Sequence, residues 1–304
     1  MTIAEHGLIY EERLKFHRSL LNSILTIDSN GVVSNADVDN KTSSKIAKGI
    51  FDKILAATGF PPVPQPKKSA QTAGKEFEGK VTEFIKSTFP KLQDLRPGDW
   101  KVERLGNRNS IKASSFSQYN HLQQLNKLIA GNSTLATALG KDYIIAPDII
   151  ISRGLCSDDE INNNSLKTKL VDEESSLYSD LREKSFDSKI AKKRIMHASI
   201  SVKWTMRSDR AQNSRTEALN LIRNRKGRLP HIMIVTAEPA PSRLASLALG
   251  TGDIDCVYHF ALMEFLDYID SDNTLSDDLK DLLHMLVDGK RVKDISDLPL
   301  DLCV

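Results

Sequence analysis

Three charged side chains, far apart along the chain, have the chemistry needed to hydrolyse a phosphodiester bond. Asp148 lies in the apolar segment YIIAPDIIIS, Lys203 lies in the alternating segment ASISVKWT, and Glu217 follows fourteen residues later. Carboxylates that hold magnesium ions make a water nucleophilic at neutral pH and stabilise charge on the phosphate. A lysine ammonium positions or polarises that water as a compact cation. The pattern indicates metal-assisted hydrolysis if the fold brings these three side chains together.

Local patterns predict the elements that must position these side chains. The segment around Asp148 is rich in β-branched residues and predicts a buried strand. In ASISVKWT, apolar and polar residues alternate, so Ser201 and Lys203 are expected on one face of a second strand. DRAQNSRTEALNLIRNRKG predicts a helix that ends at Gly227. Such a helix could turn back and place Glu217 beside the strand.

The remaining patterns predict a mixed α/β fold with a central sheet flanked by helices. Helices are expected over the first ~30 residues, in IAKGIFDKILAATG up to Gly59, and from Thr72 onward, where Glu78 lies beside an apolar face. HIMIVTAE predicts another strand, and residues 157–190 a polar surface excursion. We expect one domain over residues 1–304. A possible N-terminal helical subregion covers residues 1–66 and ends within the proline-rich loop PPVPQPKKSAQ.

Composition limits the class of protein. The longest apolar runs fall well short of the ~20 residues of a bilayer span, and the N-terminus lacks a secretory pattern, so a cytoplasmic location is expected. The three cysteines are widely spaced without metal-binding motifs, and free thiols, mainly buried, are expected. Trp100 and Trp204 are expected in the core. No glycine-rich loop for a nucleotide or a methyl donor is found.

Charge is concentrated locally although the whole chain carries only +2. From Lys203 to Arg228 there are eight Lys or Arg against Asp209 and Glu217, a net charge of +6. A cationic stretch of this kind fits the phosphate backbone of DNA.

The order of these motifs resembles a known nuclease pattern. Pro147–Asp148, then SVK at Ser201–Lys203, then Glu217 resembles the permuted PD-(D/E)xK signature, in which Ser201 occupies the usual acidic position and a helix glutamate replaces it. Together with KWTMRSDR, this pattern is similar to type II restriction endonucleases that cut sites with a CCGG core. GVVSNAD, LRPGDW, RNRKGRLPHI, VTAEPAPSR and ALGTGDIDCVYHFAL follow in the same order as in that family.

The resemblance implies roles for the catalytic residues. Asp148 and Glu217 become metal ligands, Lys203 the catalytic lysine, Glu78 in KEFEG a further acidic member, and Ser201 the vacated acidic position. The implied cofactor is Mg²⁺, with two ions in each active site.

The resemblance also implies how DNA is read. Arginine donates two hydrogen bonds to guanine O6 and N7, and aspartate accepts from cytosine N4. The implied readers of the CCGG core are Arg207, Asp209 and Arg210. Arg243 and Asp37 are the implied pair for the outer G·C, and Gln71 is the implied minor-groove contact. The implied target is GCCGGC, cut to leave 5′ overhangs.

The implied assembly is a homotetramer of back-to-back dimers. Symmetric cutting of both strands of a palindrome requires at least a dimer.

Two alternatives stay open from the residues alone. A non-catalytic DNA-binding protein would use the basic helix without needing Asp148, Lys203 and Glu217 to converge. A repair nuclease with the same core would cut with little sequence preference. Taken singly, the residues also fit plain structural roles: Asp148 as a strand-end carboxylate held by backbone amides, Glu217 as a surface partner of a nearby cation, and Arg243 as a phosphate contact.

Overall fold

The computed structural model describes residues 6–61, 68–105, 113–123, 147–183, 193–206, 208–250 and 252–304, without the side chains of 208–211. Its centre is a six-stranded sheet in the order β1-β2-β3-β4-β5-β6. The first three strands pair antiparallel and the last four pair parallel. The strands are β1 (Trp100–Arg104), β2 (Ile149–Arg153), β3 (Ile195–Lys203), β4 (His231–Thr236), β5 (Cys256–His259) and β6 (Val292–Asp294). The predicted mixed α/β class is therefore confirmed.

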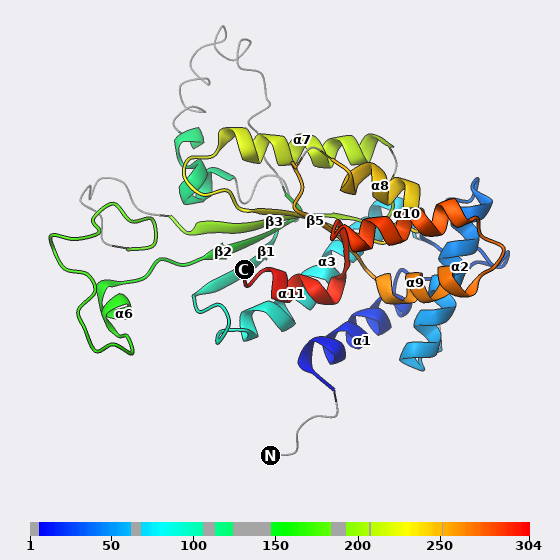
Figure 1. The fold of residues 1–304 in the computed structure, drawn as a ribbon, viewed down its shortest axis with the longest axis horizontal. Helices are drawn as coiled ribbons and strands as arrows, with labels where there is room; N and C mark the ends of the chain where they lie inside the picture. Colours follow the sequence, from blue (N-terminus) through cyan, green and yellow to red (C-terminus); the bar gives the residue numbers. More distant parts are fainter. Residues whose placement is uncertain are drawn as a thin grey trace, which may run out of the picture.

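Helices lie on both sides of this sheet (Figure 1), with α7 and α8 above the strands in that view and α1 and α3 below them. The longer helices are α1 (Leu8–Leu21), α2 (Lys41–Thr58), α3 (Ala70–Thr88), α7 (Ser208–Asn224), α8 (Pro241–Ala248), α9 (Leu262–Ser271) and α10 (Asp277–Asp288). Two short ones are α6 (Asp158–Asn162) and α11 (Leu298–Asp301). Apolar side chains from both layers form one buried cluster against the sheet.

Strand β3 is the central positioning element. Seven of its nine residues are buried, since helices cover both of its faces. Its antiparallel register with β2 pairs Ile149 with Ile200. Asp148, which immediately precedes β2, consequently lies beside Ser201 at the carboxyl end of β3.

Several predicted elements are confirmed with small shifts in their ends. The second helix ends as expected, because Gly59 adopts the left-handed conformation (φ +59°) that closes α2. The first helix ends at Leu21 instead of near residue 30, because the next backbone amides bond back to Leu20 and the chain turns. Helix α3 begins at Ala70, where the Ser69 hydroxyl accepts from the Thr72 amide, so Gln71 lies in a helical turn and not in a loop.

The polar excursion forms an arm, residues 154–183, that contains α6 and projects from the body (Figure 1). Its fold depends on Arg182, whose side chain is 1% exposed. The guanidinium donates to both carboxylate oxygens of Asp158, at 2.5 and 2.8 Å, and to the backbone carbonyl of Asp172 at 2.6 Å. A buried cation therefore organises a segment whose composition is polar. Residues 184–190 of the predicted excursion lie outside the described residues.

The cysteine prediction was correct in part. All three thiols are free, but only Cys256 is buried, while Cys156 and Cys303 are partly exposed. Among the residues that the structure describes, none of the helices combines the length and the apolar character that a bilayer crossing demands.

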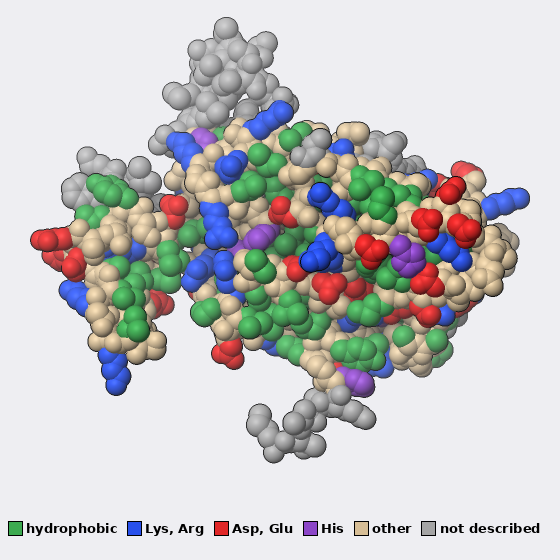
Figure 2. Space-filling model, in the orientation of Figure 1, with side chains coloured by type: hydrophobic (Ala, Val, Ile, Leu, Met, Phe, Trp, Pro, Cys, Tyr) green, Lys and Arg blue, Asp and Glu red, His purple; other side chains and the backbone are tan. Residues whose placement is uncertain are grey.

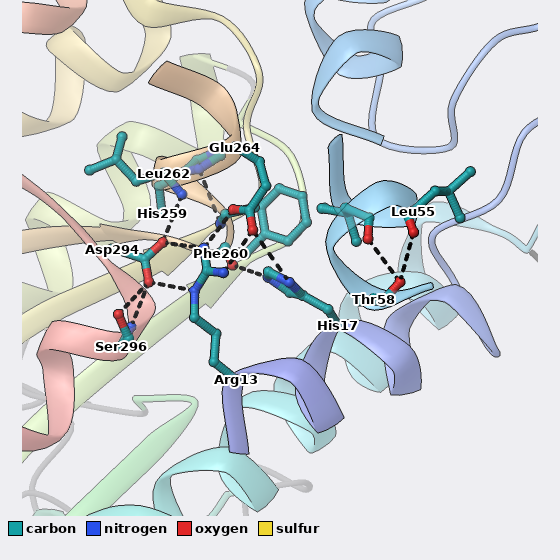
Figure 3. Close-up of polar contacts among 12 residues, drawn as sticks. Arg13, His17, Leu55, Thr58, His259, Phe260, Leu262, Glu264, Asp294 and Ser296 are labelled. Carbon is teal, nitrogen blue, oxygen red and sulfur yellow. Dashed lines mark hydrogen bonds and ion pairs between the residues drawn. The ribbon is translucent and has the colours of Figure 1, made fainter. Parts of the chain in front are cut away.

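A buried charge network fastens α1 to the rest of the fold (Figure 3). Arg13 donates to both oxygens of Glu264 on α9, at 2.7 and 2.5 Å, and to both oxygens of Asp294 on β6, at 2.8 Å. All three side chains are at most 8% exposed. His17, one turn later, contacts the carbonyl of Phe260 at 2.9 Å. Because α1 packs on α3, this network also fixes the helix that carries Glu78.

Removing the Arg13 guanidinium should cost more stability than removing an ordinary surface ion pair. We expect Arg13→Ala to lower the free energy of unfolding by about 3–5 kcal/mol, because it leaves two buried carboxylates without their partner. Urea denaturation at neutral pH measures this loss. Lys15→Ala is the matched control on the same helix, since Lys15 forms only an exposed pair with Glu12 and should cost at most about 1 kcal/mol.

Acid should reduce the difference in the free energy of unfolding between Arg13→Ala and the unmodified chain. Burial alone would raise the pKa of Asp294, but the hydrogen bonds from Arg13 more than offset it, so the pKa lies below its usual value. A depressed carboxylate pKa stabilises the fold at neutral pH, and that contribution is lost as the pH falls through the folded pKa. If the difference in the free energy of unfolding stays constant from neutral to acidic pH, this account is contradicted.

Candidate active site

Asp148 is held at the end of β3 by one of its two oxygens. Its Oδ2 atom accepts from the Val202 amide at 2.7 Å and from Lys203 Nζ at 2.8 Å, and the Ser201 hydroxyl lies 3.5 Å away. Both side chains of the Asp148–Lys203 ion pair are partly exposed, at 22% and 18%. No described residue donates to Oδ1. Asp148 is therefore oriented by the strand and keeps an oxygen that can bind a cation or a water.

Helix α7 contacts the same end of β3 through Ser214, about one turn before Glu217. The hydroxyls of Ser214 and Ser201 lie 3.3 Å apart, and Ser214 is buried. Glu217 follows Ser214 by three residues, which is about 4.5 Å along the axis and on the same side of the helix. Its side chain is partly buried. The helix thus turns back over the strand as the sequence predicts.

Glu78 reaches this group from α3. Burial and the charge of Asp148 raise its pKa, while Arg104 and Lys203 act in the opposite direction. Arg104, on β1, donates to Glu78 Oε2 from two nitrogens, at 3.0 and 3.3 Å. The neighbouring residue Phe77 packs edge-on against Trp204, with ring centroids 5.1 Å apart. An aromatic contact therefore holds α3 against the end of β3.

This donor set suits a hard divalent cation. Asp148, Glu217 and Glu78 offer carboxylate oxygens, and magnesium needs only one or two carboxylates beside water and substrate oxygens. Within the described part of the chain, no group of three or more His, Cys, Asp or Glu side chains is placed so that it could hold a metal ion by itself. The residues fit an open site completed by substrate, and they do not fit a closed structural one.

A second polar group lies beyond the active site, where the Asp37 loop meets the start of α8. Arg243 forms an ion pair with Asp37, and its other terminal nitrogen lies 3.7 Å from Glu238 Oε1. The Asn35 amide donates to the carbonyl of Ala237 at 2.8 Å and anchors the loop. Asp37 and Arg243 are 206 positions apart in sequence. The fold thus joins the two residues that the resemblance implies for one base pair.

Comparison with known proteins shows the family of this chain. A family model described as the NgoMIV restriction enzyme matches residues 16–304. The chain belongs to the NgoMIV restriction enzyme family. It is 52% identical over 298 residues to the type II restriction enzyme NgoMIV of Neisseria gonorrhoeae, which covers 98% of this chain and 99% of that relative. The protein is a type II site-specific deoxyribonuclease that acts on double-stranded DNA, and enzymes of this class use divalent metal ions.

Membership of this family decides between the alternatives left open by the residues. A type II restriction enzyme cuts DNA and does so at a defined sequence, unlike a non-catalytic binding protein or an unspecific repair nuclease. The roles of individual residues in this family member stay predictions.

Three of the predicted DNA contacts cannot be placed in detail. Arg207 lies outside the described residues. Asp209 and Arg210 lie in the first turn of α7, which begins at Ser208, but their side chains are outside the described part. Gln71 is exposed at the amino end of α3, and no hydrogen bond of its side chain to a described residue is formed.

Two residues of the site escaped the sequence analysis. Arg104 is separated from Glu78 by 26 positions and meets it only because β1 lies beside α3. Glu238 is fully buried and accepts from the amides of Met206, at 2.7 Å, and Ala240, at 3.1 Å. Burial raises the pKa of Glu238, and these amides and Arg243 oppose that rise. The segment VTAEPAPSR contained Glu238, but only its depth in the fold distinguishes it from a surface glutamate.

The Arg104–Glu78 contact yields a prediction about pH. In Arg104→Met, the pKa of Glu78 should rise further, since a cation that lowers it is removed. If cleavage needs ionised Glu78, the acidic limb of the single-turnover rate against pH should move to higher pH.

Two comparisons test that reading of the pH profile. Lys101→Met, on the same strand but paired with Glu103 at the surface, should leave the limb in place. Glu78→Gln should lower the rate and abolish any further effect of Arg104→Met. An unmoved limb in Arg104→Met would remove Glu78 from the titrating groups.

Proposed function

We propose that this enzyme cleaves GCCGGC in double-stranded DNA with Mg²⁺, leaving 5′ overhangs, as the nuclease of a restriction-modification system. The observation that carries the catalytic part is the hydrogen bond of 2.8 Å from Lys203 Nζ to Asp148 Oδ2, beneath a helix that returns Glu217 to the same strand end. The recognition part is supported by the resemblance of RSDR and PSR to the readers of the CCGG-core group.

In this proposal Asp148 and Glu217 hold the metal, two ions in each active site. Bound magnesium supplies a water of lowered pKa and charge stabilisation at the phosphate. Asp148 Oδ2 keeps the Lys203 ammonium at the end of β3, so that it can donate a hydrogen bond to the attacking water. Glu78 accepts from water on the α3 side, held there by Arg104. Ser201 links Asp148 to Ser214 and thereby fixes the distance between β3 and α7.

Two of the proposed base readers lie together before DNA arrives. Arg243 and Asp37 bind each other in this structure, so binding to an outer G·C pair exchanges that ion pair for contacts to guanine and cytosine edges. Because the two side chains satisfy each other without DNA, only a base pair that supplies matching contacts can compensate for the loss of this ion pair, and a wrong base pair cannot. Arg207, Asp209 and Arg210 read the CCGG core, and Gln71 contacts the minor groove.

The proposed assembly is at least a dimer, and a homotetramer in the form implied by the resemblance. Palindromic cutting requires two active sites related by a two-fold axis. The arm supports further contacts between protomers, since it exposes the apolar side chains of Leu166, Leu170 and Tyr178. We also propose that residues 1–304 act as one domain, because α1 and α2 pack on α3 and α9.

Cleavage mapping tests the function as a whole. A long DNA of known sequence should be cut in Mg²⁺ only at GCCGGC, with 5′ overhangs at each cut. Cutting at a similar rate in DNA without this site would favour an unspecific nuclease. Binding without any nicking would favour a DNA-binding protein that has lost catalysis.

Asp148→Ala tests the catalytic core. We expect at least about 100-fold slower cleavage, because both a metal ligand and the anchor of Lys203 are lost. Binding to GCCGGC in Ca²⁺, measured by gel shift, should persist, since this carboxylate does not read bases. Asp159→Ala, an exposed carboxylate on the arm, is the control and should cleave normally. Loss of site binding by a folded Asp148→Ala protein would contradict the assigned role.

Arg243→Ala tests base readout. Loss of a two-pronged arginine contact should cost roughly 1–3 kcal/mol of discrimination at the outer G·C pair, with the CCGG core still required. Competition between GCCGGC and sites altered at the outer pair measures this. A uniform weakening for all sequences, with a smaller salt dependence, would instead identify Arg243 as a phosphate contact.

A further inference from the structure

A second charged site lies at the opposite end of the sheet from Asp148 and Lys203. A cavity of about 520 Å³ opens where β3 and β4 begin and β2 ends, between the body and the arm. Its floor includes His197, six residues before Lys203 on the same strand, which is about 20 Å along β3. Figure 2 shows Lys and Arg side chains with a histidine gathered where the arm meets the body. The cavity is therefore separate from the catalytic group.

The described walls of this cavity carry more cations than carboxylates. Arg96, Arg153, Lys226 and Arg228 line it against one carboxylate, Asp180, for a net charge of +3 with neutral imidazoles. None of the acidic side chains that the structure describes forms an ion pair with these four cations. The Nε atoms of Arg96 and Arg153 are buried and lack a hydrogen-bond acceptor among the described residues.

Arg96 and Arg153 are partly exposed, but a buried N–H donor without an acceptor is costly, and an oxygen atom of an anion would satisfy it. A guanidinium has five donors in a fixed plane and binds phosphate or carboxylate with two parallel hydrogen bonds. Several cations around one hollow, with a single carboxylate among them, favour a ligand of more than one negative charge. A phosphoryl group has both the charge and the acceptor number.

One wall of the cavity is aromatic. Trp100, expected in the core, is instead only half-buried, and the Arg153 guanidinium lies 5.7 Å from the centre of its ring. His197 lies 4.7 Å from Trp100 and 5.0 Å from His231, centre to centre. Flat rings beside arginine groups form the surface on which nucleobases stack.

The cavity is already formed in this structure. Gln118 exchanges two hydrogen bonds with the backbone of Met196, at 2.7 and 3.0 Å. The Trp100 indole donates to the carbonyl of Arg96 at 2.9 Å, which fixes the ring. A ligand would therefore find oriented groups and would not have to order them.

The electrostatics of His197 agree with a field from converging cations. Burial lowers its pKa to about 4, and the charges of His231, Arg96 and Arg228 act in the same direction, against a hydrogen bond to the carbonyl of Leu302. The ring is neutral at physiological pH, so the arginines and the lysine supply the positive charge of the cavity.

We propose that this cavity binds a mononucleotide, with its phosphate between Arg153, Arg96 and Arg228 and its base against Trp100. The volume suits a ligand of this size, since small-molecule sites span about 300–1,000 Å³. The site is independent of the proposed DNA readers and of the metal ligands, so its test does not depend on cleavage.

The chain provides an internal reporter for this site. It contains two tryptophans, and Trp204 lies in the core. In Trp204→Phe, the fluorescence comes from Trp100 alone. Titration with dAMP in buffer without divalent metal should quench it saturably, with a Kd below about 1 mM.

Two parent compounds divide the contributions of base and phosphate. Deoxyadenosine should bind at least tenfold more weakly than dAMP, because it lacks the phosphoryl group. Inorganic phosphate should compete with dAMP without matching its affinity. Equal affinity for phosphate and dAMP would overturn the nucleotide assignment, since it would show a simple anion site without base recognition.

Variants locate the binding. Arg228→Ala and Arg153→Ala should each weaken dAMP binding about tenfold or more, as expected for loss of a charge-assisted contact. Arg223→Ala is the matched control, because Arg223 is an exposed arginine of the same basic stretch outside the cavity. The absence of saturable quenching, or equal losses in Arg223→Ala, would overturn the proposal.

A second measurement covers the case in which Trp204→Phe does not fold. A ligand that binds only the folded protein raises its melting temperature. In the unmodified chain, dAMP should raise the Tm, and Arg228→Ala should abolish that rise while Arg223→Ala keeps it. An equal rise in all three proteins would place the nucleotide elsewhere and overturn the assignment.

Discussion

The active-site geometry depends on the register between two antiparallel strands. Ile149 pairs with Ile200, and this places Asp148 where the Val202 amide and the Lys203 ammonium both reach its Oδ2 atom. A slip of one residue would turn every side chain of β2 to the other face and separate the ion pair. The buried isoleucines of β2 prevent such a slip, because helices cover both sides of the sheet there. Hydrophobic burial thus sets the position of a charged pair that is itself partly exposed.

The surrounding helices reach this strand end through a few long-range contacts of different kinds. Helix α7 is linked through Ser214 and Ser201, and α3 through the packing of Phe77 on Trp204. The loop after β3 is fastened by Glu238, a buried carboxylate whose lone pairs are occupied by backbone amides. Behind α3, the Arg13 network locks α1 in place. Each contact is satisfied within the protein, so the site is preorganised before substrate binds.

Charge is divided between the two ends of the sheet. At the carboxyl end of β3, acidic groups and one lysine form a site suited to a metal and a phosphodiester. At its amino end, four cations and one carboxylate line a cavity, and two buried arginine Nε atoms there have no acceptor in the part of the chain that the structure describes. The protein tolerates such an arrangement at a cost in desolvation, and a bound anion would offset it. The two sites lie about 20 Å apart along β3, so a variant of one site removes none of the side chains of the other.

The sequence by itself determined the features that follow from local periodicity and turn chemistry. It located β3 and the shared face of Ser201 and Lys203, the end of α2 at Gly59, the helix that returns Glu217, and the family of the chain. Alternation, amphipathic spacing and a left-handed glycine act over a few residues, so a single segment suffices to show them.

Only the tertiary structure decided which distant residues meet and how deeply each is buried. Arg104 beside Glu78, Arg243 beside Asp37, the buried Arg182 of a polar arm and the half-buried Trp100 of a cationic cavity carry no local signal. In the sequence alone, a lysine, arginine or glutamate with one of these roles looks like any other residue of its type. Their roles differ because strand pairing and helix packing, which act over tens to hundreds of residues, assign each one its neighbours and its exposure to water.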